Sequence, residues 1–307
     1  MKPNRSIYLF ASMALAALCA DAEPLLWYRF GGSYATIENV ASPGTMNGTL
    51  KSIDKWNDLE LGDITAKFPT RGEDFPTKAG VYDPVSRKTI SGPAKALQFS
   101  GNQASAGVVY LSNSDSAALK GLTNFTCEAF FKMPQNTYTN AHEANNFPLI
   151  VWGKHGEQGW KIIFARNKNG KVEPLFRGVA RSVSGADNLD FTVRDQSGSP
   201  AYCADGEWHH LAVVVDGKKD GSTMTCRLYL DYKEILSYSL EGCCGFYYND
   251  SDTAPFVIGA DLFRNVSNAT TRETFMGSIA DLRITPEALP PESFLRAVRP
   301  GLMFTVW

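Results

Sequence analysis

Residues 125–131 read Phe125-Thr126-Cys127-Glu128-Ala129-Phe130-Phe131, and their odd-numbered positions are all apolar. Successive side chains of a β-strand point to opposite faces, so this alternation predicts a strand with one face against a core. Similar alternation or a short apolar run recurs in residues 26–30, 96–99, 108–111, 149–152, 160–165, 172–177, 208–215, 224–230, 235–240, 256–258 and 275–284. Turn signals such as Asn169-Gly170 and Asp205-Gly206 separate these segments. About a dozen strands at this spacing predict an all-β antiparallel sandwich or barrel.

The composition is that of a folded protein, and its charge does not favour binding to polyanions. The 307 residues are 44% hydrophobic and 20% charged. Lys and Arg number 30 against 32 Asp and Glu, so no cationic surplus exists to neutralise phosphates. We therefore expect no nucleic acid among the partners. No repeat of fixed period or low-complexity linker interrupts the chain, which predicts one domain over residues 23–307.

The first 22 residues have the organisation of a secretory signal. Lys2 and Arg5 precede an apolar run that ends near Ala20, and Ala20-Asp21-Ala22 offers small residues for cleavage before Glu23. The run is shorter than the roughly 20 apolar residues that span a bilayer. We therefore expect residues 1–22 to be a signal peptide and the mature chain to contain no membrane span. The expected location is secreted, periplasmic or on the cell surface.

Five cysteines follow residue 22, and an odd number leaves at least one thiol unpaired or paired between chains. In an oxidising compartment we expect one structural disulfide. It would join Cys243 or Cys244 to Cys203 or Cys226, and the sequence does not choose among these pairings. No C-x-x-C pattern indicates a zinc knuckle or a redox pair.

One long segment lacks strand periodicity. Residues 51–95 contain four prolines together with the aromatic residues Trp56, Phe68, Phe75 and Tyr82. Because so long a connection is uncommon unless its own side chains pack it down, we expect an ordered insert. Helical signals are few. We expect a turn at residues 114–119 and a helix that opens at 290–292 and runs towards residue 298.

Nine short segments occur in one order along the chain: Trp27-Tyr28-Arg29-Phe30, Asn47-Gly48-Thr49-Leu50, residues 96–101, residues 125–129, Ile150-Val151-Trp152-Gly153-Lys154, residues 207–212, residues 227–231, Val257-Ile258-Gly259 and residues 275–284. Together they resemble the laminin-G-like branch of the concanavalin A-like lectin and glucanase superfamily. The resemblance implies a jelly roll of two packed antiparallel sheets. It also implies a secreted or surface protein that binds glycans or other proteins, often with calcium. The chain departs from the pattern at Tyr232, where a turn glycine is usual, and at Ala280, where an acidic residue is frequent.

Catalytic patterns are missing from the sequence. Glucan-cleaving jelly rolls carry an E-x-D-x-E strand that brings a nucleophile and an acid to one face, and no such pattern occurs. We therefore expect no catalytic residue. The alternative is a polysaccharide-degrading enzyme of the same architecture, a glycoside hydrolase or lyase, with carboxylates that distant segments bring together.

Histidines and one charge pair have structural interpretations. Adjacent strand residues face opposite ways, so His209 and His210 cannot share a metal or a substrate, and we expect packed, hydrogen-bonded roles for both. Glu128 and Arg283 each lie within an apolar strand pattern. The topology implied by the resemblance places their strands side by side, so we predict a cross-strand ion pair.

The loop at residues 242–252 holds the main candidate ligand-binding residues, Tyr247, Tyr248, Asp250 and Asp252. Aromatic rings stack on the C–H faces of sugars, and carboxylates accept hydrogen bonds from hydroxyls or coordinate calcium. An interpretation of equal weight packs the tyrosines beneath the loop and leaves the acids exposed.

Two further polar segments supply weaker candidates. Asp187 and Asp190 form an oxygen cluster that is the candidate calcium site, although calcium rests mainly on the resemblance. Tyr138 and His142 lie in another polar loop and are further candidates for ligand binding. We predict a non-catalytic module that binds a polysaccharide, a glycan or a surface protein through rim loops. A structural component of the cell envelope is the second alternative.

Overall fold

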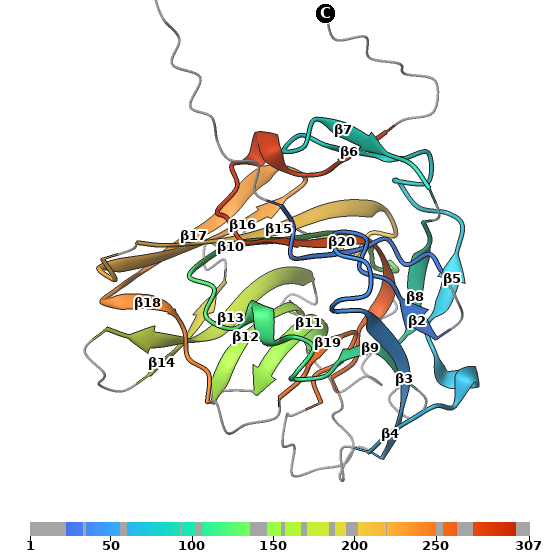
Figure 1. The fold of residues 1–307 in the computed structure, drawn as a ribbon, viewed down its shortest axis with the longest axis horizontal. Helices are drawn as coiled ribbons and strands as arrows, with labels where there is room; N and C mark the ends of the chain where they lie inside the picture. The colour runs from blue at the N-terminus through green and yellow to red at the C-terminus, as the bar shows by residue number, and fades with distance from the viewer. Residues whose placement is uncertain are drawn as a thin grey trace, which may run out of the picture.

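The computed structural model describes residues 23–32, 35–55, 60–92, 94–101, 106–135, 146–154, 157–166, 171–183, 188–194, 202–218, 220–249, 254–262 and 273–298. Two large antiparallel sheets are stacked in these residues, and a small third sheet lies on top of one of them (Figure 1). The prediction of an all-β, two-sheet antiparallel jelly-roll sandwich is confirmed.

The upper sheet in Figure 1 runs from β17 at one edge to β5 at the other. In spatial order it contains β17 (Lys233–Glu241), β16 (Thr223–Leu230), β15 (Trp208–Gly217), β10 (Asn124–Lys132), β20 (Met276–Thr285), β8 (Ala96–Ser100) and β5 (Thr70–Gly72), and β1 (Leu26–Tyr28) also pairs with β20. The neighbours β10 and β20 come from segments about half the chain apart, so most of the sheet depends on long-range pairing.

The lower sheet lies beneath the upper one in Figure 1. In spatial order it contains β14 (Leu189–Val193), β13 (Val172–Ser182), β12 (Gln158–Arg166), β11 (Asn146–Lys154), β19 (Phe256–Ile258), β9 (Gly107–Leu111), β3 (Gly48–Lys55) and β2 (Thr36–Ile37). Off this path, β18 (Cys243–Phe246) pairs with β13 and β4 (Glu60–Gly62) pairs with β3.

The third sheet contains β21 (Arg296–Ala297), β6 (Val81–Asp83) and β7 (Lys88–Ile90). Three short 3-10 helices complete the described part of the chain: η1 (Thr65–Lys67), η2 (Ala117–Leu119) and η3 (Pro291–Ser293). The turn expected at residues 114–119 is therefore present as η2. Among the described residues, no helix has the length and apolarity to cross a membrane.

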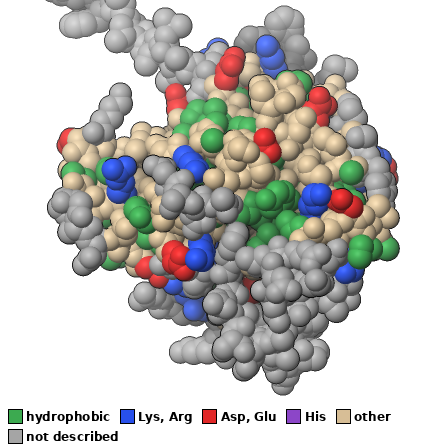
Figure 2. Space-filling model, turned by 60° about the horizontal axis from the view of Figure 1, so that its bottom comes forward, with side chains coloured by type: hydrophobic (Ala, Val, Ile, Leu, Met, Phe, Trp, Pro, Cys, Tyr) green, Lys and Arg blue, Asp and Glu red, His purple; other side chains and the backbone are tan. Residues whose placement is uncertain are grey.

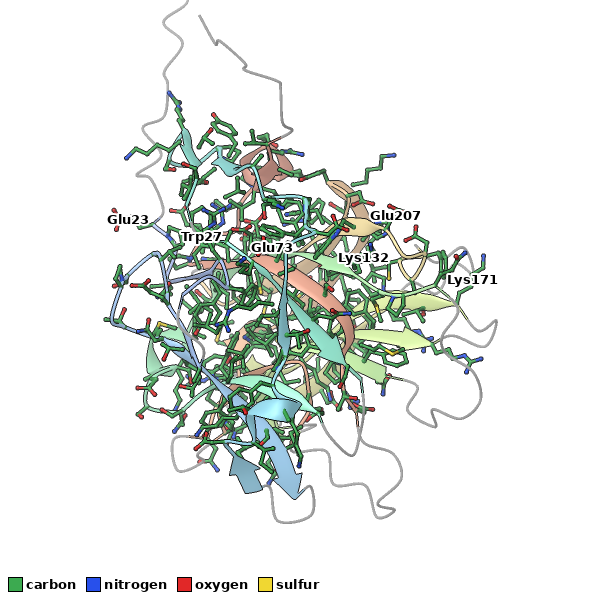
Figure 3. All side chains as sticks on the ribbon, turned by 90° about the vertical axis from the view of Figure 1, so that its right-hand side faces the viewer. Glu23, Trp27, Glu73, Lys132, Lys171 and Glu207 are labelled. Carbon is green, nitrogen blue, oxygen red and sulfur yellow. The ribbon has the colours of Figure 1, made fainter. Side chains whose placement is uncertain are left out.

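The alternating side chains of β10 lie on the two faces of the sheet as predicted. Phe125, Cys127, Ala129 and Phe131 are buried in the core between the two large sheets, whereas Glu128 faces the other side of its sheet. Side chains of both sheets crowd the space between them (Figure 3). Aromatic rings dominate this core, because each buries a large apolar area.

The outer face of the upper sheet is also buried. The insert contributes Phe75 and Val81, and the segment after β20 contributes Leu295, to a second apolar cluster with Trp27 and Phe130. The β6–β7 hairpin and η3 lie above this sheet in Figure 1. Most of the insert is therefore ordered, as expected, although Trp56 lies outside the described residues.

Beneath the β6–β7 hairpin and η3, Arg283 forms hydrogen bonds with several buried polar groups. Its side chain is 1% exposed. Its Nε donates to Glu128 Oε1 at 2.8 Å and its Nη1 donates to Asp83 Oδ1 at 2.6 Å. Glu128 also accepts the Leu295 N–H at 2.8 Å and contacts His210 Nε2 at 2.9 Å. The predicted pair of Glu128 and Arg283 is confirmed, directly across the β10–β20 register.

Burial alone would raise the pKa of Glu128. The Arg283 guanidinium and the His210 hydrogen bond outweigh that effect and hold the pKa at about 2. The carboxylate is therefore charged at neutral pH although it is fully buried. A charge in such a place is tolerated only because every side of it is paired.

Two sequence predictions are wrong. The helix expected from 290 towards 298 ends after Ser293, because the chain then extends to pair β21 with β6. The expected disulfide is also not formed: Cys127, Cys203, Cys226, Cys243 and Cys244 are all free thiols. Four of them are buried among apolar side chains, where a cysteine serves as a small hydrophobic residue, and only Cys244 is partly exposed.

Candidate functional site

The end of the β11–β12 hairpin is built around two glycines. Gly153 and Gly159 face each other across the ladder, next to the pair formed by Trp152 and Trp160. Gly159 has φ +78°, and a Cβ there would collide with the backbone oxygen of Trp152. Only glycine permits both the left-handed backbone and this close approach. The glycines thus bring the two strands together at the rim of the sandwich, between two hollows.

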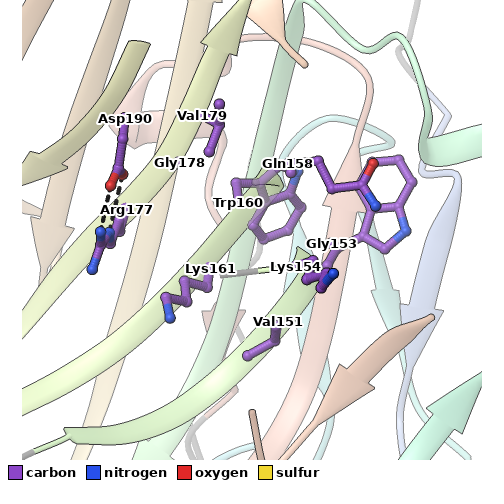
Figure 4. Close-up of a pocket in the computed structure, with 12 residues that line it drawn as sticks. Val151, Gly153, Lys154, Gln158, Trp160, Lys161, Arg177, Gly178, Val179 and Asp190 are labelled. Atoms are coloured by element: carbon purple, nitrogen blue, oxygen red, sulfur yellow. Dashed lines mark hydrogen bonds and ion pairs between the residues drawn. The ribbon is translucent and has the colours of Figure 1, made fainter. Parts of the chain in front are cut away.

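The first, the face hollow, lies on the outer face of the lower sheet across β11 to β14 (Figure 4). It is a shallow depression: its empty space of about 240 Å³ includes open solvent, and the part deep enough to enclose a water is about 10 Å³. Val151 and Val179 give it an apolar lining, and Lys161, Arg177 and Asp190 bring polar ends to it. Its other lining residues are Trp152, Gly153, Lys154, Gln158, Gly159, Trp160 and Gly178.

Charges in the face hollow are paired. Arg177 Nε donates to Asp190 Oδ1 at 3.1 Å, and its Nη2 donates to the second carboxylate oxygen. Lys161 Nζ lies 2.7 Å from Asp261 Oδ2, and both side chains are buried. Figure 2, turned so that the bottom of the molecule comes forward, shows hydrophobic patches with scattered acidic and basic side chains between them. The face hollow therefore offers oriented hydrogen-bonding groups rather than a strong net charge.

The second, the rim hollow, lies beside the same hairpin and is equally shallow, with about 200 Å³ of empty space that includes open solvent. Tyr248 is packed against Trp152, with 4.3 Å between ring centroids. Burial raises the pKa of Tyr248 well above its usual value. The next residue, Asn249, donates its backbone N–H to Gln158 Oε1 at 2.6 Å, which fixes the loop to the hairpin. The remaining lining residues are Asn113, Lys120, Gly153 and Ala254.

The structure places two of the predicted site residues at these hollows: Tyr248 lines the rim hollow and Asp190 lines the face hollow. Tyr247 lines neither, and its backbone links the sheet by accepting the Gly159 N–H and donating to the Val179 carbonyl. The other predicted residues, Tyr138, His142, Asp187, Asp250 and Asp252, lie outside the described residues.

Of the two residues predicted to bind calcium, the structure describes Asp190 alone. Both of its carboxylate oxygens accept hydrogen bonds from Arg177, so a second cation there would compete with the guanidinium. Within the described part of the chain, no group of three or more His, Cys, Asp or Glu residues is placed to hold a metal ion.

The two histidines have structural roles on opposite faces of β15. His209 Nδ1 lies 2.8 Å from Asp231 Oδ2, and its Nε2 lies 3.1 Å from Asp205 Oδ1. The hydrogen bond to Asp231 is the main reason that the pKa of His209 rises to about 9. His210 instead stacks on Tyr232, with ring centroids 4.5 Å apart, and contacts Glu128.

Sequence reasoning missed most of the hollow-lining residues, including Trp152, Gln158 and Arg177. It assigned Trp152 and Arg177 to strands, left Gln158 between two strands, and did not ask which residues would border a hollow at the strand ends. The signal that could have located them is the pair Gly153 and Gly159, since glycine within a strand often marks a close backbone approach or a site.

Comparisons with known proteins agree with this architecture. Residues 104–293 match the Laminin_G_3 family model, described as the concanavalin A-like lectin/glucanases superfamily. A search of curated proteins finds no match.

Among solved structures, the binding domain of botulinum neurotoxin DC in complex with SialylT is similar, with 11% identity and a TM-score of 0.49. The alignment covers 89% of this chain and 50% of that one, so the chain spans about half its length. The IT-sialidase CBM40 of Ruminococcus gnavus is 16% identical, with a TM-score of 0.37 over 58% of this chain and 84% of that one. The pentraxin of Limulus polyphemus is 14% identical, with a TM-score of 0.32 over 56% and 67% of the two chains.

The family model covers more than half of the sequence, and the family resemblance expected from the sequence is confirmed. The chain belongs to the concanavalin A-like lectin/glucanase superfamily.

Proposed function

We propose that this protein is an exported, non-catalytic carbohydrate-binding module whose ligand lies along the end of the β11–β12 hairpin. The observation that carries the proposal is the pair of adjoining hollows that share Trp152, Gly153 and Gln158. Together they form a polar and apolar surface on both sides of one rigid hairpin. Export follows from the expected signal peptide at residues 1–22.

The lining has the chemistry of a sugar site. Val151 and Val179 line the face hollow but are only 3% and 4% exposed, so they offer the C–H groups of a sugar ring a small apolar contact. Arg177 and Asp190 are 28% and 41% exposed, so beside their own pair they can donate to and accept from the hydroxyls of a saccharide, and the Asn113 amide can do both. Small-ligand sites commonly combine an apolar lining with a few placed polar groups in this way.

Binding without cleavage is favoured by the carboxylates. Glycoside hydrolysis needs two carboxyl groups about 5 to 10 Å apart, one of them able to donate a proton. Among the described lining residues of the two hollows, Asp190 is the one carboxylate, and Arg177 holds both of its oxygens. This arrangement supports a receptor for an intact glycan.

The experiment measures retention on a panel of immobilised polysaccharides and the release of new sugar ends, each with and without a calcium chelator. We expect retention on at least one neutral polysaccharide, no released ends and no effect of the chelator. Release of sugar ends would support the hydrolase or lyase alternative instead. Absence of retention on every member would leave the envelope or protein-adhesion interpretations in place of this one.

Variants then locate the site. Arg177→Gln should weaken retention about tenfold, since one charge-assisted hydrogen bond contributes on the order of 1.4 kcal/mol to binding. Arg227→Gln is the matched control, because Arg227 pairs with Asp216 across two strands of the other sheet at similar exposure. Equal losses in both variants would show that the face hollow is not the site.

A further inference from the structure

Strand β18 lies at the opposite end of the sandwich from β5 (Figure 1). A cavity larger than the two hollows is lined in part by this strand. It encloses about 760 Å³, open space at its mouth included. Its lining comes from the loop before β10, the end of β13, the residue after β15 and β18 itself. The residues are Gly121, Leu122, Thr123, Arg181, Lys218, Cys244, Gly245 and Phe246.

The charge of this cavity is positive. Arg181 and Lys218 are exposed at it, and no Asp or Glu is among its lining residues. Within the described part of the chain, neither cation makes an ion pair, in contrast to Arg177 and Lys161 at the face hollow. Two acids lie two residues from Lys218 in sequence. Asp216 pairs with Arg227, and Asp220 accepts the Ser222 N–H at 2.8 Å, which together with the nearby Lys218 ammonium lowers the pKa of Asp220.

The floor is kept open by a glycine. Gly245 has φ +131°, a conformation that L side chains rarely adopt, and a Cβ there would lie 3.3 Å from Thr123 Cγ2. Because Gly245 has no side chain, the hydroxyl residue Thr123 and the partly buried Leu122 can line the cavity beside the two cations. A ligand here meets positive charge, one hydroxyl and a limited apolar area.

We propose that this cavity is a second saccharide site, selective for carboxylated sugars such as uronates. A guanidinium binds a carboxylate through two parallel hydrogen bonds, and an ammonium adds a mobile point charge. Without the open solvent the cavity holds about 380 Å³, which lies at the lower end of the range of small-ligand pockets, about 300 to 1,000 Å³, and exceeds the needs of an isolated carboxylate. The inference does not depend on the hollows beside β11 and β12, because the two sites share no residue.

Cys244 provides a reporter inside the cavity. Its thiol lies 3.9 Å from the Arg181 carbonyl oxygen, and it is the one partly exposed cysteine among the five that the structure describes. A bound saccharide should therefore shield it from a neutral alkylating reagent. Iodoacetamide is suitable, and peptide mass spectrometry assigns the modification to Cys244, with Cys244→Ser as the blank.

The experiment compares trigalacturonate, a neutral trisaccharide and citrate by calorimetry and by the rate of Cys244 alkylation. We expect trigalacturonate to bind and to slow alkylation at least about tenfold, and the other two to do neither. Binding should weaken in salt, because screening shortens the reach of exposed charges from about 10 Å at 0.1 M to about 3 Å at 1 M.

The double variant Arg181→Gln, Lys218→Gln should lose both effects, with unchanged thermal unfolding. The control is Arg87→Gln, Lys88→Gln, which removes the same charge from exposed positions at the β6–β7 hairpin. Citrate binding as tight as that of trigalacturonate would reduce the cavity to a general anion site and overturn the proposal. Equal protection by the neutral sugar, binding without protection, no binding, or full binding by the double variant would also overturn it.

Discussion

Arg283 shows how one side chain can organise a face of the molecule. It meets Glu128 from the neighbouring strand, Asp83 from the insert and the Ser293 carbonyl from η3. The three charged side chains are withdrawn from water, so each depends on the others for its hydrogen bonds. Removing one partner leaves the rest uncompensated, which costs far more than the pair contributes in net terms.

The first prediction concerns Glu128→Gln. We expect a loss of about 3 kcal/mol in the free energy of unfolding, the lower end of the range for breaking a buried pair, because Asp83 still neutralises Arg283. Urea denaturation measures it. Glu38→Gln, at an exposed position, should change the same quantity by less than about 0.5 kcal/mol. Comparable stability of the two variants would refute the structural role of the pair.

The second prediction concerns pH and His209. Its pKa is raised from 6.5 to about 9 in the folded state, so folding favours the protonated form. The stabilisation is therefore complete below pH 6.5 and is lost as the pH rises through 9. Denaturation series across this interval should show unfolding free energy falling with pH in the wild type, and falling less in His209→Gln.

Partner variants test the cause of that slope. Asp231→Asn removes the main hydrogen-bond acceptor of His209 and should flatten the slope. Asp216→Asn removes a carboxylate of similar exposure that pairs with Arg227, and it should leave the slope unchanged. A slope that survives in Asp231→Asn would mean that another group titrates.

At the level of elements, the β11–β12 hairpin supports both hollows. Gly159→Ala should destabilise the fold by more than about 1 kcal/mol, because alanine at φ +78° is strained and its Cβ meets the Trp152 backbone. Gly44→Ala is the control, since it has φ +85° and no atom within 4 Å of the added Cβ. The difference between the two unfolding free energies isolates the collision. Glycan retention should fall only in Gly159→Ala.

The β16–β17 turn is the other element with an unusual residue. Asp231 and Tyr232 have φ of +49° and +68°, values that favour glycine or asparagine. Tyr232 is retained there with its ring stacked on His210, its hydroxyl donating to the Leu295 carbonyl and Arg296 above its ring. These contacts account for the departure from the family pattern at this position.

A two-step series tests this account of the turn. Tyr232→Phe removes the hydroxyl alone and should cost about 1 kcal/mol of unfolding free energy. Tyr232→Asn suits the backbone better but removes the ring, and it should cost more than Tyr232→Phe. An asparagine variant as stable as the wild type would show that backbone strain, not packing, decides this position.

For the whole molecule, strand periodicity predicted the sandwich because its core depends on alternation that is local in sequence. The pair of Glu128 and Arg283 was predictable for the same reason, once the order of strands was assumed. The third partner, Asp83, was not, because nothing local indicates that the insert folds back over the upper sheet. The face hollow could not be predicted from the sequence for the same reason. Arg177 and Asp190 belong to different strands, and only the assembled sheet defines the register between them.

The cover over the upper sheet draws on two distant parts of the chain. Asp83 lies before β10 in the chain and pairs with Arg283, whereas Leu295 lies after β20 and donates its N–H to Glu128, so both contact the same buried ion pair. If either the segment of Asp83 or the segment of Leu295 moved away alone, it would expose the charges of Arg283 and Glu128 to which the other segment remains bonded. The two should therefore open and close as one unit, and their amide hydrogens should exchange with solvent at a common, slow rate.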